Sequence, residues 1–352
     1  MKIKLAILEK DKGYLNRVVT AFGSKYADEL EIYSFTDQDV ALANLESARI
    51  DVLLANDAFD INVNQLPKRC SFAYLVDSAD IDTIRDRRAI CKFQRIDLIY
   101  KQILIVYSDN VDRIGFKADG DSGKIIAFTS VGGGVGASTM AAACALHFAA
   151  RNKKVLYLNL EKFGSADLFF DGEGQIDMSD VIFALKSKKA SLQIKLKACV
   201  KQDLRGVSFF SKAKHALDMM ELNAEEINRL IKEINATGEY DYIIMDLDFG
   251  LDKELLSIYR QAHGFVLVGN GSAVSNEKTA RAYEALTTLE MNADTPLTNR
   301  TKFLYNRVSS KSGQTIEAPG LQVLGGAPVY ADASMDMLLA QLQTLDVFDK
   351  IC

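Results

Sequence analysis

The segment IIAFTSVGGGVGASTMAAACALHF, residues 125–148, joins an apolar run of strand length to a helical pattern through a turn with four glycines. Such a turn lets consecutive backbone N–H groups converge on phosphate oxygens, and the helix dipole favours the same anion. Ser138, at the start of the helix, would supply a hydroxyl ligand for Mg²⁺. A glycine-rich turn without a ligand is the alternative. The strand–turn–helix context favours a phosphate-binding loop.

On both sides of this segment, apolar runs of strand length alternate with helical patterns, which is typical of α/β proteins with parallel sheets. Before it, we expect helices centred near Arg17, Leu42, Arg88 and Leu104 and strands at residues 3–8, 31–35, 52–55, 72–76 and 98–99. From it onward, we expect strands at residues 124–130, 155–160, 207–210, 242–247, 264–268 and 302–306. The helices expected there cover residues 138–152, 179–202, 224–236, 253–262, 276–291 and a last stretch from about residue 334.

A polar stretch rich in Gly and Asp, KADGDSG at residues 117–123, separates the two halves of the chain. Its composition is typical of a linker. The 352 residues are enough for two domains, each with its own core. We therefore expect one domain at residues 1–117, a linker at 118–123 and a second domain at 124–352.

Composition argues against several classes of protein. The chain has 42 basic and 47 acidic residues, a formal charge of −5, and five scattered cysteines. A mildly acidic chain has no general attraction to DNA or anionic lipid, and scattered cysteines disfavour a disulfide framework or a zinc site. The longest nearly apolar stretch, residues 140–150, is far shorter than the ~20 residues that span a bilayer. The N-terminal apolar run is too short for a signal peptide, so we expect a cytoplasmic protein. From the charge and the short apolar stretches we also expect no DNA binding and no direct membrane insertion.

Several segments of the second half carry a family resemblance. SVGGGVGAST resembles the deviant Walker A loop of the MinD/ParA ATPases, K-G-G-x-G-K-[ST], but Gly132 and Ala137 stand where that pattern has its two lysines. YDYIIMDLDFGLD resembles the Walker B strand, with Asp246 at the metal-water position, and NLEKFGSADLFF resembles switch I, with Asp167 at its acidic position. FLYNRV resembles the strand whose Asn contacts adenine, here Asn306, and GAPVYADASM resembles the segment beside the base.

This resemblance covers nearly all of residues 124–352 and implies a P-loop NTPase-like fold that binds ATP and Mg²⁺. It implies Mg²⁺ on Ser138 and, through a water, on Asp246, with Asp167 as a switch residue. The chain departs from the family pattern at Asn159, Glu161 and Asp248. The nucleotide-binding residues that the resemblance implies are Gly133, Gly134, Val135, Gly136, Ala137, Ser138, Thr139, Asn306 and Arg307.

The two missing lysines should affect catalysis more than binding. A charge-assisted hydrogen bond contributes roughly 1.5–3 kcal/mol, so its loss weakens ATP binding by about one to two powers of ten. Cationic stabilisation of the transferring phosphoryl group contributes on the order of 10³–10⁵ in rate. We therefore expect ATP to bind and hydrolysis to be very slow or absent. Lys162 could compensate, but a solvated surface lysine is the favoured interpretation.

The first half resembles a response-regulator receiver, a flavodoxin-type domain, that has lost its phosphorylation chemistry. Glu9 and Asp11 supply an acidic pair, and we place Lys101 at the position of the lysine after strand five. The acceptor position in DVLLAND falls on Asn56, and the adjacent Asp57 points to the opposite face of the strand. An asparagine cannot form an acyl phosphate, so we expect a docking domain instead of a phosphorylation switch.

A degenerate receiver in front of a loop without the Walker lysine is similar to the CpaE/TadZ branch, pilus-assembly proteins that localise the Tad secretion machinery at a cell pole. The similarity implies an ATP-binding scaffold, a nucleotide-dependent homodimer that recruits Tad assembly proteins with little or no hydrolysis. The alternative is an active ParA/MinD-like partition or positioning ATPase. A third hypothesis, an effector driven by phosphorylation of the first domain, is disfavoured by Asn56.

Two further segments could contact partners. The lysine-rich residues 185–201 could bind DNA, lipid or an acidic protein, although a solvated helical face is the favoured interpretation. Residues 335–352 carry one lysine and are acidic, which disfavours insertion into lipid as a basic amphipathic helix. The leucines of that segment fit a core or a dimer interface.

Overall fold

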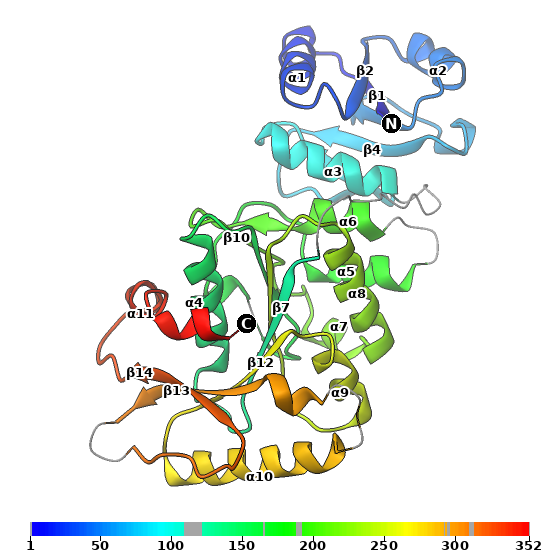
Figure 1. Cartoon of the computed structure of the whole chain (residues 1–352). Coiled ribbons are helices and arrows are strands. Elements are labelled where there is room, and N and C mark those ends of the chain that lie inside the picture. Colours follow the sequence, from blue (N-terminus) through cyan, green and yellow to red (C-terminus); the bar gives the residue numbers. More distant parts are fainter. Residues whose placement is uncertain are drawn as a thin grey trace. The chain divides into compact units, whose positions relative to one another are not determined.

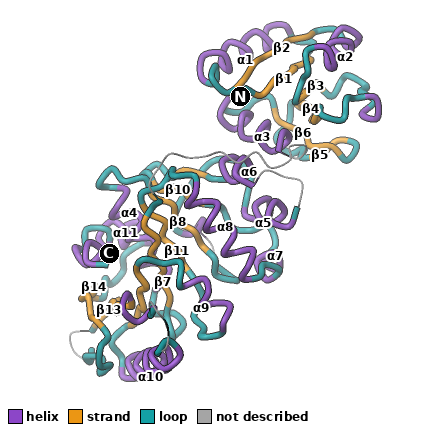
Figure 2. The backbone as a smooth tube through the Cα atoms, turned by 45° about the vertical axis from the view of Figure 1, so that its right-hand side comes forward, coloured by secondary structure: helices purple, strands orange, loops and turns teal. Residues whose placement is uncertain are grey.

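The computed structural model describes residues 2–108, 122–164, 166–187, 192–291, 293, 296–309 and 313–351. The chain forms two compact units, Met1–Gly115 with Ser187–Ala198, and Phe116–Lys186 with Cys199–Cys352, each with its own sheet (Figures 1 and 2). The expected linker at 118–123 lies outside the described residues except for Ser122 and Gly123, so its position stays a prediction. No helix in the described ranges is long and apolar enough to cross a bilayer.

The first unit contains a six-stranded sheet with the order β2-β1-β3-β4-β6-β5. All of its pairs are parallel except β5 with β6, which form an antiparallel hairpin. The predicted parallel α/β class is therefore confirmed for this half. The strands are β1 (Ile3–Leu8), β2 (Leu30–Phe35), β3 (Val52–Asn56), β4 (Ser71–Val76), β5 (Thr83–Ile84) and β6 (Arg87–Cys91).

Helices α1 (Lys12–Lys25), α2 (Gln38–Ser47) and α3 (Ile96–Ser108) cover this sheet. The central strands β3 and β4 are buried along their whole length, as expected for parallel strands with both faces covered. Asp11 and Asp37 begin α1 and α2 by accepting hydrogen bonds from backbone N–H groups of the first turn.

Two expectations for this unit were wrong, and both concern residues 83–99. The helix expected near Arg88 is the β5–β6 hairpin, whose turn residues Arg85 and Asp86 both have positive φ, as two-residue hairpin turns require. The strand expected at residues 98–99 is the start of α3, because the apolar side chains that follow it recur with helical spacing along a 13-residue helix.

The second unit contains an eight-stranded sheet with the order β14-β13-β12-β7-β11-β8-β10-β9. Only the β9–β10 pair is antiparallel among the described strands. The parallel sheet predicted for this half is confirmed. The strands are β7 (Lys124–Thr129), β8 (Val155–Asn159), β9 (Lys201–Gln202), β10 (Val207–Phe209), β11 (Tyr242–Asp246), β12 (Gly264–Gly269), β13 (Thr301–Val308) and β14 (Gln322–Pro328).

Helices cover both faces of this sheet, with α4 and α11 on one side of β7 and α8 and α9 on the other (Figure 1). Helix α4 follows the glycine-rich loop and is buried from Thr139 to Phe148, which explains why its sequence is apolar all round. Leu339 and Leu342 of α11 pack in the same core, so the core interpretation of the C-terminal leucines is confirmed. The helices that begin after the loop are α4 (Ala137–Ala149), α5 (Met178–Lys186), α6 (Leu192–Cys199), α7 (Ala216–Met220), α8 (Ala224–Ala236), α9 (Lys253–Tyr259), α10 (Ala273–Leu289) and α11 (Met335–Leu342).

The lysine-rich segment forms the end of α5 and all of α6, while residues 188–191 lie outside the described ones. Leu192, Ile194 and Leu196 of α6 are buried. Lys197 forms an ion pair with Glu29, 3.3 Å between Nζ and Oε1. This part of the segment therefore has a packed face as well as a charged one.

Candidate functional site

The candidate site lies where β7, β8 and β11 end in the second unit. In the register of the sheet, Asp246 at the end of β11 is paired with Phe128 of β7 on one side and with Asn159 of β8 on the other. The carboxyl ends of parallel strands form the usual binding edge of an open α/β sheet. The sheet therefore brings the glycine-rich loop, which follows β7, next to the ends of β8 and β11.

The loop itself has the backbone that a phosphate cradle requires. Gly134 and Gly136 have φ values of 74° and 88°, in the left-handed region that favours glycine. Gly133 and Gly134 are exposed, and apart from their chain neighbours no heavy atom of the described residues lies within 4 Å of where a side chain would begin at either position. Helix α4 begins at Ala137, so its first N–H groups face the same open space.

The end of β13 holds this loop in place. The Nδ2 of Asn306 donates a 2.9 Å hydrogen bond to the carbonyl of Val135, and this contact is buried. The next residue, Arg307, donates from Nη1 to the carbonyl of Gly134 at 3.3 Å. The structure therefore brings the predicted strand-end residues, Asn306 and Arg307, to the predicted loop. The Asn306 amide contacts the loop backbone here, whereas the resemblance implies a contact with adenine.

A buried carboxylate lies beside the loop. Asp246 is fully buried, and its Oδ2 accepts hydrogen bonds from Tyr157 Oη at 2.7 Å and from Asn159 Nδ2 at 3.0 Å. Its other oxygen, Oδ1, is buried and has no hydrogen-bond partner among the described residues. A buried oxygen without a partner costs free energy, so Oδ1 is ready to accept from a metal-bound water.

A second carboxylate adds negative charge at the same place. Burial raises the pKa of Asp246 to about 8, and the charge of Glu161 adds to this, while the hydrogen bond from Tyr157 opposes it. The hydroxyl of Ser138 donates to Oε2 of Glu161 at 3.1 Å. Two neighbouring carboxylates and a hydroxyl are hard oxygen donors of the kind that Mg²⁺ prefers. The residues present therefore fit a divalent cation beside a phosphate.

Among the described residues, the hydrogen bonds of Asp167 do not involve Ser138, Glu161 or Asp246. Its two carboxylate oxygens accept from Ser211 Oγ at 2.8 Å and from the backbone N–H of Lys212 at 2.7 Å. Its role as a switch residue stays a prediction. Lys162 is exposed, and its backbone N–H donates to Asp248.

The sequence reasoning named Asp246 but missed the side chains that hold it. Tyr157 is fully buried, and burial together with the charge of Asp246 raises its pKa well above its usual value. Tyr157 and Asn159 are two residues apart on β8, so they share one face of the strand. A polar pair at this spacing at the end of an apolar strand was the available signal. Glu161 was noted only as a departure from the family pattern.

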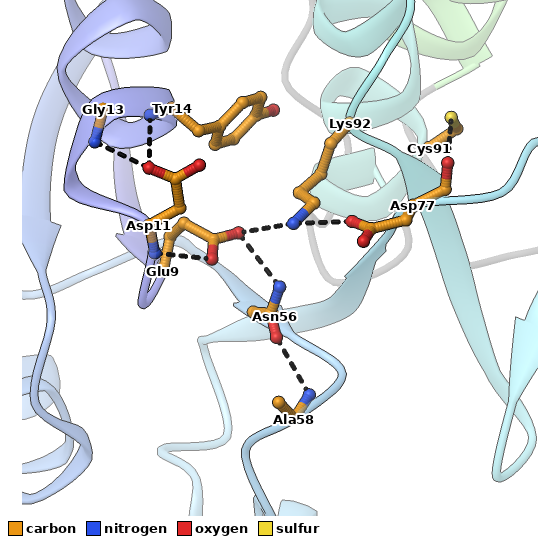
Figure 3. A network of polar contacts seen from close by, with 9 residues as sticks. All are labelled: Glu9, Asp11, Gly13, Tyr14, Asn56, Ala58, Asp77, Cys91 and Lys92. Carbon is orange, nitrogen blue, oxygen red and sulfur yellow. Dashed lines mark hydrogen bonds and ion pairs between the residues drawn. The ribbon is translucent and has the colours of Figure 1, made fainter.

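The first unit contains a second polar cluster, where β1, β3, β4 and β6 end (Figure 3). Glu9 is buried, and its Oε2 accepts from Asn56 Nδ2 at 3.0 Å and pairs with Lys92 Nζ at 3.2 Å. Lys92 also pairs with Asp77 at 2.7 Å. The side chain of Asp11 caps α1 through Gly13 and Tyr14, and its backbone N–H donates to Oε1 of Glu9 at 3.1 Å.

Lys92 corrects the expectation for Lys101. Lys101 lies within α3, whereas Lys92 follows β6 directly, and β6 is the fifth parallel strand of this sheet. Burial lowers the pKa of Lys92, but its hydrogen bonds with Asp77 and Glu9 outweigh burial and raise it. Its ammonium is therefore charged and neutralises the acidic side chains around it. The expectation failed because the fifth strand was placed at residues 98–99.

Two family models match different parts of the chain. A family model described as a TadZ-like receiver domain matches residues 1–108, and one described as an AAA domain matches residues 123–263. No sequence among curated proteins matches the chain significantly.

Several solved structures are similar in fold. A ParA family ATPase from Chlorobium tepidum TLS is 20% identical, with 65% of this chain and 92% of that chain covered and a TM-score of 0.49. The septum site-determining protein MinD from Pyrococcus horikoshii OT3, in complex with Mg-ADP, is 19% identical, with 65% and 93% covered and a TM-score of 0.49. A chain of the MinC:MinD cell division protein complex from Aquifex aeolicus is 21% identical, with 62% and 85% covered and a TM-score of 0.48.

Residues 1–108 are therefore identified as similar to a TadZ-like receiver domain, and residues 123–263 as similar to an AAA domain.

Proposed function

We propose that this protein is an ATP-binding scaffold of a Tad-type pilus assembly system. In this proposal Mg²⁺-ATP favours a homodimer, the dimer recruits Tad assembly proteins at a cell pole, and hydrolysis is slow or absent. The TadZ-like receiver domain supports the Tad role, and the AAA domain supports a nucleotide as the ligand.

One observation carries the nucleotide part of the proposal: an open glycine loop lies beside a buried carboxylate with an unpartnered oxygen. The loop offers backbone N–H groups around Gly133 and Gly134, where no heavy atom of the described residues beyond the chain neighbours lies within 4 Å of an added Cβ. Asp246 Oδ1 lacks a partner among the described residues. An anion on the first feature and a hydrated cation on the second would satisfy both, as Mg²⁺-ATP does.

The chain's own groups have distinct roles in holding this ligand. The loop N–H groups would bind phosphate oxygens, and Asp246 would hold a metal-bound water. The Ser138 hydroxyl donates its hydrogen bond to Glu161, so the lone pairs of the hydroxyl oxygen are available to Mg²⁺. When bound, Mg²⁺ supplies positive charge to the phosphates. Because Gly132 and Ala137 bring no ammonium, we propose binding as the output of the site.

Glu161 favours a second candidate function, an active ParA/MinD-like positioning ATPase. Its carboxylate lies 3.1 Å from the hydroxyl of Ser138, next to where phosphates would bind. A carboxylate at such a place can orient or deprotonate a water. Turnover rates decide between the two candidates.

The test combines calorimetry with Mg²⁺-ATP, a phosphate-release assay and sedimentation velocity on the full chain. The scaffold proposal expects saturable ATP binding, an ATP-dependent shift from monomer to dimer, and almost no phosphate release. Ser138→Ala should weaken Mg²⁺-ATP more than ATP in the presence of a chelator, because only the metal contact is removed. Brisk turnover would favour the positioning ATPase, and absence of ATP binding at millimolar Mg²⁺-ATP would refute both.

A fluorescent fusion in cells tests the localisation. A polar focus that disappears when Tad assembly genes are deleted would support the Tad role. An even distribution in cells with an intact Tad system would contradict it.

A further inference from the structure

Arg307 places a guanidinium group at the glycine loop. It stands near the end of β13, where its Nη1 donates to the carbonyl of Gly134 at 3.3 Å. The side chain is exposed, and among the described residues this is its one side-chain hydrogen bond, so most of its five N–H donors have no partner there. A cation is therefore already present at the edge of the open phosphate cradle.

The backbone of β13 is distorted in a way that aims Arg307 at the loop. Along a regular strand, neighbouring side chains point to opposite faces, so Asn306 and Arg307 should diverge. Here the register with β14 shifts between Tyr305 and Val308, where three steps along β13 match two along β14. Arg307 itself has a φ of 58°, an uncommon value for a residue with a side chain. This bulge lets both side chains reach the same loop.

Residues that hold a strained backbone are often found where a ligand binds. The glycine loop itself carries no positive side chain, because no residue from Ser130 to Thr139 is basic. Arginine is suited to this task, since its planar fork binds phosphate oxygens in pairs.

We propose that Arg307 supplies the positive charge that this phosphate loop lacks, and that its guanidinium contacts the phosphate groups of the bound nucleoside di- or triphosphate. This inference rests on the proposed nucleotide function and deepens it. The bulge in β13 thereby replaces a charge on the loop with a charge delivered from another strand of the same sheet.

The experiment measures Mg²⁺-ATP, Mg²⁺-ADP and AMP binding by calorimetry for the full-length wild type and for Arg307→Ala, Arg307→Lys and Arg307→Gly. We expect Arg307→Ala to weaken ATP by about 10- to 100-fold, with smaller effects on ADP and least on AMP. Arg307→Lys should retain most of the affinity, because it keeps the charge. Raising the salt concentration should reduce the difference between wild type and Arg307→Ala.

Arg307→Gly separates charge from structure. Glycine adopts a φ of 58° without strain, so this variant should unfold at the same or a higher urea concentration than the wild type while it loses ATP affinity. Arg281→Ala on α10 is the matched control, since Arg281 is also exposed and makes no hydrogen bond to the loop in the described structure. It should bind all three ligands like the wild type.

The outcomes separate the inference from the function on which it rests. Wild-type ATP binding with no loss in Arg307→Ala would overturn the role of Arg307 and leave the proposed function intact. An equal loss for ATP and AMP together with a lower urea midpoint in Arg307→Gly would show that Arg307 only holds the loop. If the wild type binds no ATP, the proposed function and this inference both fail.

Discussion

Replacing Gly136 by alanine should destabilise the second unit and disturb the loop. Gly136 has a φ of 88°, which an alanine adopts only with strain. An added Cβ would also overlap Nδ2 of Asn306, which is buried and held by its 2.9 Å bond to the carbonyl of Val135. The substitution therefore forces either the backbone or Asn306 to move.

The magnitude follows from these two effects. A left-handed conformation costs a residue with a Cβ roughly 1–2 kcal/mol. Moving the Asn306 amide away leaves buried polar groups without their hydrogen bond, which costs about 1–3 kcal/mol. We therefore expect Gly136→Ala to lower the free energy of unfolding of this unit by about 2–5 kcal/mol. ATP affinity should fall as well, since the loop carbonyls and N–H groups shift together.

Urea unfolding followed by far-ultraviolet circular dichroism measures the effect, with the two units analysed as separate transitions because a two-unit chain need not unfold in one step. Gly133→Ala is the matched control in the same loop. Its φ is not in the left-handed region, and no heavy atom lies within 4 Å of its added Cβ, so its change should stay within about 0.5 kcal/mol. Equal unfolding free energies for Gly136→Ala and Gly133→Ala would refute this reasoning.

Three more predictions concern the two polar clusters. Because the pKa of Asp246 rises from 3.8 to about 8 on folding, wild-type stability without ligand should fall from about pH 4 to pH 8, by at most about 1.4 kcal/mol per pH unit. Asp246→Asn should lack this slope in urea titrations, and parallel slopes would contradict the assignment. Lys92→Met leaves Glu9 buried without its ammonium and should cost the first unit about 3–5 kcal/mol in urea unfolding, partly recovered by adding Glu9→Gln; no recovery would argue against the pair. Asn56→Asp puts a second carboxylate beside Glu9, so it should lower the melting temperature of the first unit and make it rise with millimolar Mg²⁺, whereas a melting temperature insensitive to Mg²⁺ would contradict this.

Much of the fold could be predicted from the sequence because its elements carry strong local signals. The bounds of β1 and α8 agree with the expected ones, and α8 begins at a capping box formed by Asn223 and Glu226. Strand β6 was missed because Arg87 and Arg88 conceal a short strand that is formed by pairing with β4 and β5. Strand β14 was also missed, because its two glycines weaken the strand signal in the sequence.

The candidate site was predictable in part for a similar reason. The glycine loop and Asp246 are visible in the sequence, because backbone requirements and a charged residue after an apolar strand are local features. Contacts between strands are not local. Neither the hydrogen bond from Tyr157 to Asp246 nor the bulge that aims Arg307 could be expected before the sheet order and register were known.

The lysine inside the first unit has a consequence for how this protein receives signals. Lys92, and not a bound metal ion, neutralises the acidic side chains of Glu9 and Asp77. The charge of this cluster therefore does not depend on the supply of metal ions in the cell. The buried pair of Lys92 and Glu9 also keeps the same composition whatever that supply is. A variable input would instead act through the second unit, where the exposed glycine loop lies beside the unpartnered Oδ1 of Asp246.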